Sequence, residues 1–226
     1  MNKLITILAS GLIAVLSFAS AANSIELRAG IGAQSLVAYA NVKESLKGNN
    51  SRTTNEEAIA AFSYTSGFIE VGVDEVYGIS FGIEYSPDSI ALEKETRNIN
   101  PSLVGDTGAQ TIDGSVEDML MAYVAVPISD GGLYAKVGYF QAELITSESL
   151  VTGSTYSNAD IEGMSVGFGY DLDITETVFV RAEGMYTEYD DLKLTGSEID
   201  SVSSNYNVIT AELGGINAKI FLGVQF

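Results

Sequence analysis

The chain contains no cysteine, no histidine and no tryptophan, and only 3 proline residues among its 226. Without cysteine it can form neither a disulfide nor a thiolate metal site. Without histidine it lacks the general base of Ser-His hydrolases and the commonest metal ligand. Basic residues are scarce as well, because 11 Lys and Arg stand against 30 Asp and Glu and give a formal net charge of −19. That charge excludes a general nucleic-acid binder, since nothing would offset the repulsion from phosphates.

A long apolar run occurs only at the N-terminus. Met1 to Lys3 is a short basic start, Leu4 to Phe18 is almost entirely apolar, and Ala19-Ser-Ala21 has the small-x-small form of a cleavage site. We therefore predict a signal peptide over 1–21 and a single mature domain over 22–226. A membrane anchor is the alternative, but the run is short for a span and lacks a basic stop-transfer flank. No later run reaches the roughly eighteen apolar residues of a transmembrane helix, so a mature protein in the membrane would cross it as strands.

What the chain does have is glycine, with 23 residues, tyrosine, with 12, and a strict alternation at its C-terminus. Over residues 216–226 every second side chain is apolar, with Phe221 the one apolar residue on the polar face. A period of two over this length predicts a half-buried strand, and a membrane-spanning strand needs about nine to eleven residues. The apolar face comprises Ile216, Ala218, Ile220, Leu222, Val224 and Phe226.

Seven earlier segments alternate in the same way, so we predict eight strands, over 25–34, 58–74, 79–85, 117–126, 133–146, 164–170, 178–189 and 208–226. The last has a potential break at Gly214-Gly215. Short turns at 74–77, 129–132 and 171–176 alternate with long loops at 35–55, 92–115, 147–158 and 190–207, and the first loop has room for a short helix over 36–40. Phe62 and Tyr64 fall on the polar face of the second strand, so either a bulge near Ser66-Gly67 changes the phase or both rings point inward. The pattern predicts an all-β fold: a single eight-stranded antiparallel transmembrane β-barrel after a cleaved signal peptide.

The architecture and the terminal aromatic strand resemble the small eight-stranded outer-membrane proteins of bacteria, of the OmpA, OmpX and opacity-protein type. The resemblance covers the whole mature chain and implies a monomer in the outer membrane, in contact with lipid and lipopolysaccharide. It also implies an insertion signal for the outer-membrane assembly machinery at Ile220, Leu222, Val224 and Phe226. Many members have an aromatic where Val224 stands. Since no residue follows Phe226, we expect no appended peptidoglycan-binding domain.

The inward face of the predicted strands carries charges of both signs. In a barrel of eight strands the interior is just wide enough for side chains to fill, and buried charges must be paired. We therefore expect a salt-bridged core rather than an ion path, which is the alternative for the same residues. The predicted lumen network comprises Glu26, Arg28, Glu70, Glu84, Glu117, Lys136, Arg181, Glu183 and Lys219.

These residues favour a structural or surface-interaction role, with a closed lumen and external loops available to an extracellular ligand. A small ion-conducting channel is the alternative function, and a soluble periplasmic β-sandwich or lipocalin-like binder is disfavoured by the apolar outward faces. We expect no enzymatic activity, no cofactor and no metal site. Acidic pairs such as Asp190-Asp191 and Glu56-Glu57 are typical of solvated loops, and no Asp-x-Asp-x-Asp-Gly calcium loop is present.

Overall fold

A computed structural model describes residues 25–47, 52–73, 78–99, 108–150, 155–197 and 206–226. The predicted signal peptide and the predicted turn at 74–77 lie outside these residues. Among the described residues no helix is long and apolar enough to cross a membrane. Eight long strands follow one another along the chain: β1 (Ile25–Lys47), β2 (Arg52–Val73), β3 (Ile79–Ser86), β6 (Gly108–Pro127), β7 (Leu133–Ser149), β8 (Ala159–Asp173), β9 (Val178–Tyr189) and β11 (Tyr206–Gln225). The short strands are β4 (Ile90–Ala91), β5 (Glu95–Ile99) and β10 (Leu192–Thr195).

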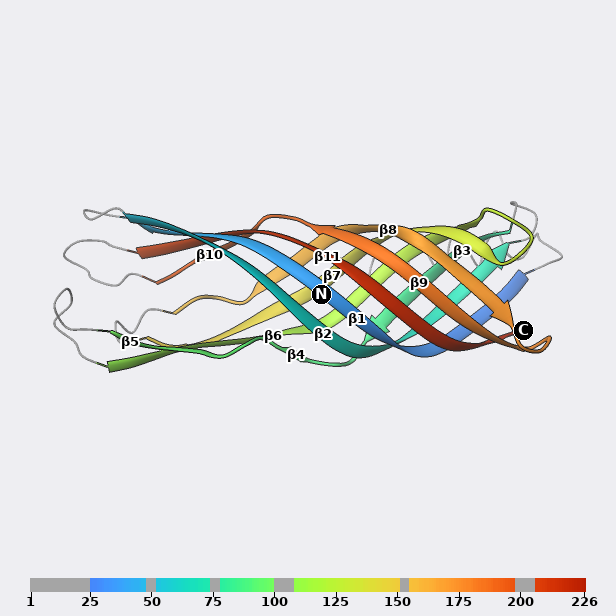
Figure 1. The fold of residues 1–226 in the computed structure, drawn as a ribbon, viewed down its shortest axis with the longest axis horizontal. Coiled ribbons are helices and arrows are strands. Elements are labelled where there is room, and N and C mark those ends of the chain that lie inside the picture. Colours follow the sequence, from blue (N-terminus) through green and yellow to red (C-terminus); the bar gives the residue numbers. More distant parts are fainter. Residues whose placement is uncertain (1–24, 48–51, 74–77, 100–107, 151–154, 198–205) are drawn as a thin grey trace.

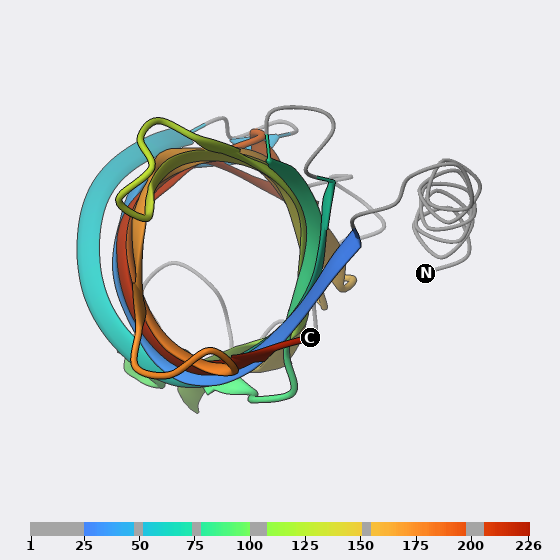
Figure 2. The ribbon, with the colours of Figure 1, turned by 90° about the vertical axis from the view of Figure 1, so that its right-hand side faces the viewer.

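Each long strand pairs antiparallel with its neighbours in the chain, and β1 pairs with β11, so the sheet closes into a barrel (Figures 1 and 2). The paired residues, followed once round the barrel, lead from Arg28 to Ala38, ten residues further along the same strand. Such a stagger means that the strands tilt against the barrel axis, as closure of a sheet requires. The all-β barrel predicted from the alternation is confirmed.

The two faces of the strands follow the predicted phases. Outward positions are apolar and exposed over the part of the barrel near the chain ends, as at Ile31, Val166, Phe168 and Leu222. Inward positions are buried and mix charged, polar and aromatic side chains, as at Arg181 on β9. A lipid-facing band and a polar interior are what a small membrane barrel requires.

The strands are longer than predicted wherever they leave the lipid-facing band. β1 continues to Lys47 and β2 begins at Arg52, so the expected loop over 35–55, and the short helix over 36–40, are wrong. β5 and the first part of β6 occupy much of the expected loop over 92–115, and β10 lies in the one expected over 190–207. Lys43, Lys47 and Lys193 therefore lie in strands and not in loops. Outside the membrane both faces of a strand meet water, and the apolar alternation that marks a strand disappears.

Both suspected irregularities are absent from the described strands, and one that was not predicted occurs in β6. β2 pairs with β1 in one continuous register, so the second strand has no bulge and Phe62 and Tyr64 point inward. β11 likewise pairs with β1 without a break at Gly214-Gly215. β6 instead contains a bulge between Glu117 and Leu120, where Asp118 has a φ of 52°. The predicted turn at 129–132 connects β6 and β7, with Gly132 at a φ of 87°.

Several large rings fit into the narrow lumen because they lie over a glycine of a neighbouring strand. Tyr123 pairs in register with Gly82, and Tyr134 pairs with Gly169. A Cβ atom at either glycine would overlap the ring opposite it. The same arrangement places Phe68 over Gly30 and Phe179 over Gly223. The glycines thus set how much aromatic volume the barrel can hold.

Candidate functional site

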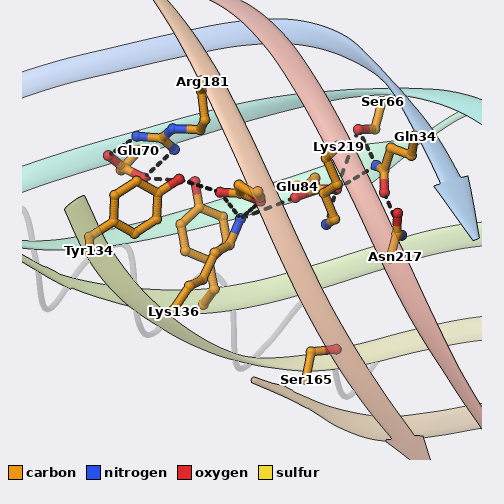
Figure 3. Close-up of polar contacts among 12 residues, drawn as sticks. Gln34, Ser66, Glu70, Glu84, Tyr134, Lys136, Ser165, Arg181, Asn217 and Lys219 are labelled. Atoms are coloured by element: carbon orange, nitrogen blue, oxygen red, sulfur yellow. Dashed lines mark hydrogen bonds and ion pairs between the residues drawn. The ribbon is translucent and has the colours of Figure 1, made fainter. Parts of the chain in front are cut away.

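The candidate site is the row of charged and polar side chains that fills the lumen. Alternation along the strands turns every second side chain inward, and the register brings charged inward residues from seven strands to neighbouring heights. Figure 3 shows part of this row, from Arg181 and Glu70 past Tyr134 and Lys136 to Glu84, Gln34 and Asn217, along the inside of the barrel. It divides into two ion-pair clusters and a polar extension.

The first cluster is centred on Arg181 of β9, whose side chain is 1% exposed. Its guanidinium donates two hydrogen bonds to Glu70, at 2.9 and 3.1 Å, and two to Asp171, both at 2.7 Å. Tyr123 donates a further hydrogen bond of 3.0 Å to Glu70. Two bidentate pairs on one guanidinium are a strong and rigid form of charge pairing. We call Glu26, Arg28, Glu70, Asp171 and Arg181 the Arg181 cluster.

Arg28 extends this cluster toward the end of the barrel where β1 begins and β11 ends. Its guanidinium lies 3.1 Å from Asp171, 3.7 Å from Glu70 and 2.8 Å from Glu26. The side chains of Arg28 and Glu26 remain 24% and 30% exposed. Water therefore screens this outer pair far more than it screens Arg181.

The second cluster is centred on Lys136 of β7, and we call Glu84, Lys136, Glu183 and Lys219 the Lys136 cluster. The ammonium of Lys136 lies 2.9 Å from both oxygens of Glu183 and 3.3 Å from Glu84. Lys219 donates to the other oxygen of Glu84 at 2.7 Å. Tyr134 donates to Glu183 at 2.6 Å, and the Lys136 ammonium lies 3.8 Å from the centre of the Tyr123 ring. All four charged groups are buried and have partners of opposite sign.

A polar extension continues from Glu84 toward the end of the barrel opposite Phe226, which we call the external half. Gln34 donates to Glu84 at 2.5 Å and also to Ser66, while Asn217 donates to Gln34 at 2.8 Å and to Tyr64 at 2.9 Å. Among the described residues the Oδ1 atom of Asn217 has no hydrogen-bond partner, and Asn217 lines a cavity of about 20 Å³. That volume accommodates about one water molecule.

Two apolar clusters pack beside the charged groups. In the first, the Phe68 ring meets the Phe221 ring edge-on at a centroid distance of 5.1 Å, and the Phe179 ring lies 6.3 Å from Phe68. The Arg181 guanidinium stacks 4.5 Å from the centre of Phe68. On the external side, a buried cluster closes over the polar extension, formed by Tyr64, Ile90, Met119 and Ala142. The buried charges thus pack against apolar side chains, whereas Glu26 and Arg28 remain partly exposed.

The structure brings together all but one of the predicted network residues. Glu117 is the exception, because the bulge at Asp118 reverses the phase of β6 and its carboxylate instead accepts hydrogen bonds from Ser89 and Ser115. Periodicity alone could not reveal this reversal. Asp171 was missed because it was assigned to a turn, whereas β8 continues to Asp173. Asp171 follows the inward-facing Gly169 by two residues, and this spacing could have placed its side chain in the lumen.

The charges of the network nearly cancel. Four cations (Arg28, Lys136, Arg181 and Lys219) face five carboxylates (Glu26, Glu70, Glu84, Asp171 and Glu183). Pairing of this kind offsets the cost of removing charges from water. In the part of the chain that the structure describes, no group of three or more acidic residues is arranged to hold a metal ion.

The four residues of the expected insertion signal lie on the outward face of β11. Leu222 is 59% exposed and Phe226 is 74% exposed, and Ile220 and Val224 share this face. The backbone of Phe226 exchanges two hydrogen bonds with Leu27 of β1, at 2.9 and 3.1 Å. The end of the chain therefore takes part in closing the barrel.

Comparison with known proteins gives the same fold. The family model described as outer membrane protein beta-barrel domain matches residues 8–213. The outer-membrane protein OprG from Pseudomonas aeruginosa is similar in structure, with a TM-score of 0.58, 11% identity, and coverage of 91% of this chain and 97% of that chain. The outer-membrane protease OmpT from Escherichia coli has a TM-score of 0.49 and 12% identity, covering 89% of this chain and 97% of that chain. Among curated protein sequences none matches.

Proposed function

Because the chain belongs to the outer-membrane β-barrel domain family and is located in the bacterial outer membrane, we propose that it is a non-catalytic barrel with a closed lumen. Its role is structural and interactive, and the external strands and loops are the parts that meet ligands. The outward apolar face contacts lipid and lipopolysaccharide, and the protein acts as a monomer. Folding depends on the assembly machinery that recognises the C-terminal strand.

The observation that carries this proposal is the pairing of the buried lumen charges. Arg181 and Lys136, at 1% and 2% exposed, each contact two carboxylates from other strands. A conducting path needs charged groups that face water, because an ion must exchange its hydration shell for them. Here the buried charged groups are bound to one another and packed against aromatic and aliphatic side chains. Moving them apart would leave several buried charges without partners.

A small ion channel is the second candidate, and one observation favours it. Polar groups are continuous from the half-exposed Glu26 and Arg28 through both clusters to Asn217. If the ion pairs opened, this row would become a polar lining. In a closed barrel the ion pairs stabilise the fold, whereas in a channel the same charged groups would line a water-filled path.

Planar-bilayer recordings of the wild-type barrel and of Arg181→Ala distinguish the two candidates. For a closed barrel we expect no wild-type current above leak, and we expect Arg181→Ala to lower the unfolding stability in lipid vesicles. Steady wild-type conductance, with an Arg181→Ala variant of unchanged stability and altered ion selectivity, would overturn the closed-lumen proposal in favour of the channel. Arg28→Ala is the matched control, because Arg28 is partly exposed to water.

A further inference from the structure

Two tyrosines from different strands meet on the outer wall of the barrel. The hydroxyls of Tyr39 on β1 and Tyr186 on β9 lie 3.2 Å apart, and either can donate the hydrogen bond. The two residues are 147 positions apart in the chain. β11 lies between their strands, because it pairs with β1 on one side and with β9 on the other. The pair therefore bridges the strand that closes the barrel.

A glycine of β11 makes this contact possible. Neighbouring strands are about 4.8 Å apart, so β1 and β9 are separated by roughly 10 Å. Gly214 pairs in register with Tyr39, and a Cβ atom at this glycine would overlap the Tyr39 ring. Gly214 is on the outward face of β11 and is nevertheless buried, because the ring covers it. The side chain of Tyr39 thus lies across β11 and carries its hydroxyl toward β9.

The pair lies at the external boundary of the lipid-facing band. Toward the end where β11 finishes, the neighbouring outward residues are Val37 and Ile216, both exposed and apolar. Toward the external half, the outward positions are Glu188 and Glu212, both exposed. Tyrosine is enriched where the hydrocarbon gives way to headgroups and water. Water-soluble reagents therefore reach both rings, which are 38% and 40% exposed.

The partner of each hydroxyl distinguishes this pair from an ordinary boundary tyrosine. Such tyrosines present their hydroxyls to headgroups and water. Here the hydroxyls of Tyr39 and Tyr186 contact each other. Tyr85 on the same outer wall is 44% exposed, and its hydroxyl donates to the carboxylate of Asp118 at 3.4 Å. Two phenols in contact can be coupled by oxidation, whereas a phenol beside a carboxylate has no second ring to couple with.

We propose that Tyr39 and Tyr186 form an oxidative modification site, at which a peroxidase with hydrogen peroxide, as one-electron oxidant, joins the two rings into dityrosine. Each phenol loses one electron and its hydroxyl proton, and the two phenoxyl radicals form a C–C bond between ortho carbons. Each of these carbons then releases its hydrogen as a proton, and each oxygen regains a proton. The two electrons and two protons lost in total reduce one hydrogen peroxide to two molecules of water.

The geometry favours coupling within one chain over coupling between chains. An ortho carbon is bonded directly to the carbon that bears the hydroxyl. Rings whose hydroxyls are in contact therefore need only small rotations of their side chains to bring two ortho carbons together. Both side chains are also held on strands of one sheet, so their effective concentration exceeds that of tyrosines on separate barrels.

The cross-link would stabilise the closure of the barrel. It would connect β1 to β9 over β11, between residues 147 positions apart. A covalent bond across so long a stretch of chain restricts the unfolded state far more than the folded state. The barrel would therefore resist unfolding more strongly once an oxidant has reached the cell surface. This effect does not depend on whether the lumen conducts ions.

The test uses the full-length barrel, folded in lipid vesicles and treated with peroxidase and hydrogen peroxide. We expect dityrosine fluorescence, a chain mass lower by two hydrogen atoms, and a cross-link between the tryptic peptides 29–43 and 182–193. After boiling, the cross-linked chain should migrate faster on a gel than the untreated chain, because it contains a closed loop. The urea midpoint of unfolding should rise. Products that join only separate chains, or the absence of any cross-link, would overturn the proposal.

Variants that keep the fold test which groups react. Tyr39→Phe and Tyr186→Phe each remove one of the two hydroxyls, and we expect either change to abolish the cross-linked peptide. Tyr85→Phe is the matched control and should leave the yield unchanged, because that hydroxyl contacts a carboxylate. Gly214→Ala retains both phenols but displaces the Tyr39 ring, so we expect it to lose the product as well.

Unboiled gels verify that each variant is folded before the oxidant is added. A cross-link that persists in Tyr39→Phe, or an undiminished yield in folded Gly214→Ala, would refute the site. If Gly214→Ala does not fold, the two phenylalanine variants decide the question.

Discussion

At the scale of single residues, the burial of a charged side chain determines how much unfolding free energy is lost when that side chain is removed from its ion pairs. Arg181 is 1% exposed and holds Glu70 and Asp171, whereas Arg28 touches the same carboxylates from a side chain that is 24% exposed. We expect Arg181→Ala to lower the free energy of unfolding by about 3–5 kcal/mol, because it leaves buried carboxylates without their main partner. Arg28→Ala should cost no more than about 1 kcal/mol. Urea unfolding in lipid vesicles measures both, and equal losses would contradict the assignment of burial.

The residues of the network show what sequence periodicity can and cannot reveal. Glu70, Lys136, Arg181 and Glu183 could be placed inward because the alternation around them is regular. Glu117 could not, since a bulge reverses the phase and nothing in the residue types near Asp118 marks it. The partners of each charge were also beyond prediction, because they depend on the stagger between strands and not on order within one strand.

At the scale of a strand, the fit between rings and glycines limits substitution. Gly169 on β8 faces inward beneath the Tyr134 ring, while Gly184 on β9 faces outward with nothing within 4 Å of an added Cβ. We expect Gly169→Val to destabilise the barrel by about 1–3 kcal/mol, since the ring must move and its hydrogen bond to Glu183 is strained. Gly184→Val should change stability by less than about 0.5 kcal/mol. Unfolding in vesicles compares the two, and a larger loss for Gly184→Val would mean that the faces are reversed.

An added charge on β11 should cost more in the middle of the apolar band than at the rim of the barrel. Leu222 points outward into the apolar band, whereas Gln225 lies at the rim, where it donates to Asp173 and to the backbone of Glu176. We predict that Leu222→Arg costs about 2–4 kcal/mol near the membrane midplane, and Gln225→Arg about 0–1 kcal/mol near the interface. Equal sensitivity in vesicle unfolding would contradict the depth assigned to these residues.

Strand identity and facing were predictable, but strand length was not. The alternation of Ile25, Leu27, Ala29 and Ile31 reflects lipid on one side and the lumen on the other. After Tyr39 that contrast ends, and β1 nevertheless continues to Lys47 because β2 and β11 supply hydrogen bonds on both sides. β11 is distant from β1 in the chain, and the local sequence around 40–47 does not show that strands will pair there.

At the scale of the whole molecule, the last residue takes part in barrel closure. Phe226 exchanges two backbone hydrogen bonds with Leu27 and presents its ring outward. We predict that deletion of Phe226 leaves export intact and impairs insertion, so that the protein accumulates in the periplasm. Cell fractionation, with unboiled gels to detect the folded barrel, measures this. Normal outer-membrane levels of the truncated chain would argue against a C-terminal insertion signal, and Gln225→Ala is the control that keeps the aromatic end.

The ladder between β1 and β11 has a consequence for the order in which the fold can form. Its contacts join residues 159 positions apart at Lys47 and Tyr206, and 197 positions apart at Arg28 and Gln225. Contacts of such separation require nearly the whole chain to lose its freedom first, so topology places closure late and makes it slow. Until β11 arrives, β1 and β9 each present an open edge to their surroundings. A chain whose final twenty residues have not yet joined the sheet would therefore expose two unpaired strand edges, and its barrel could not close.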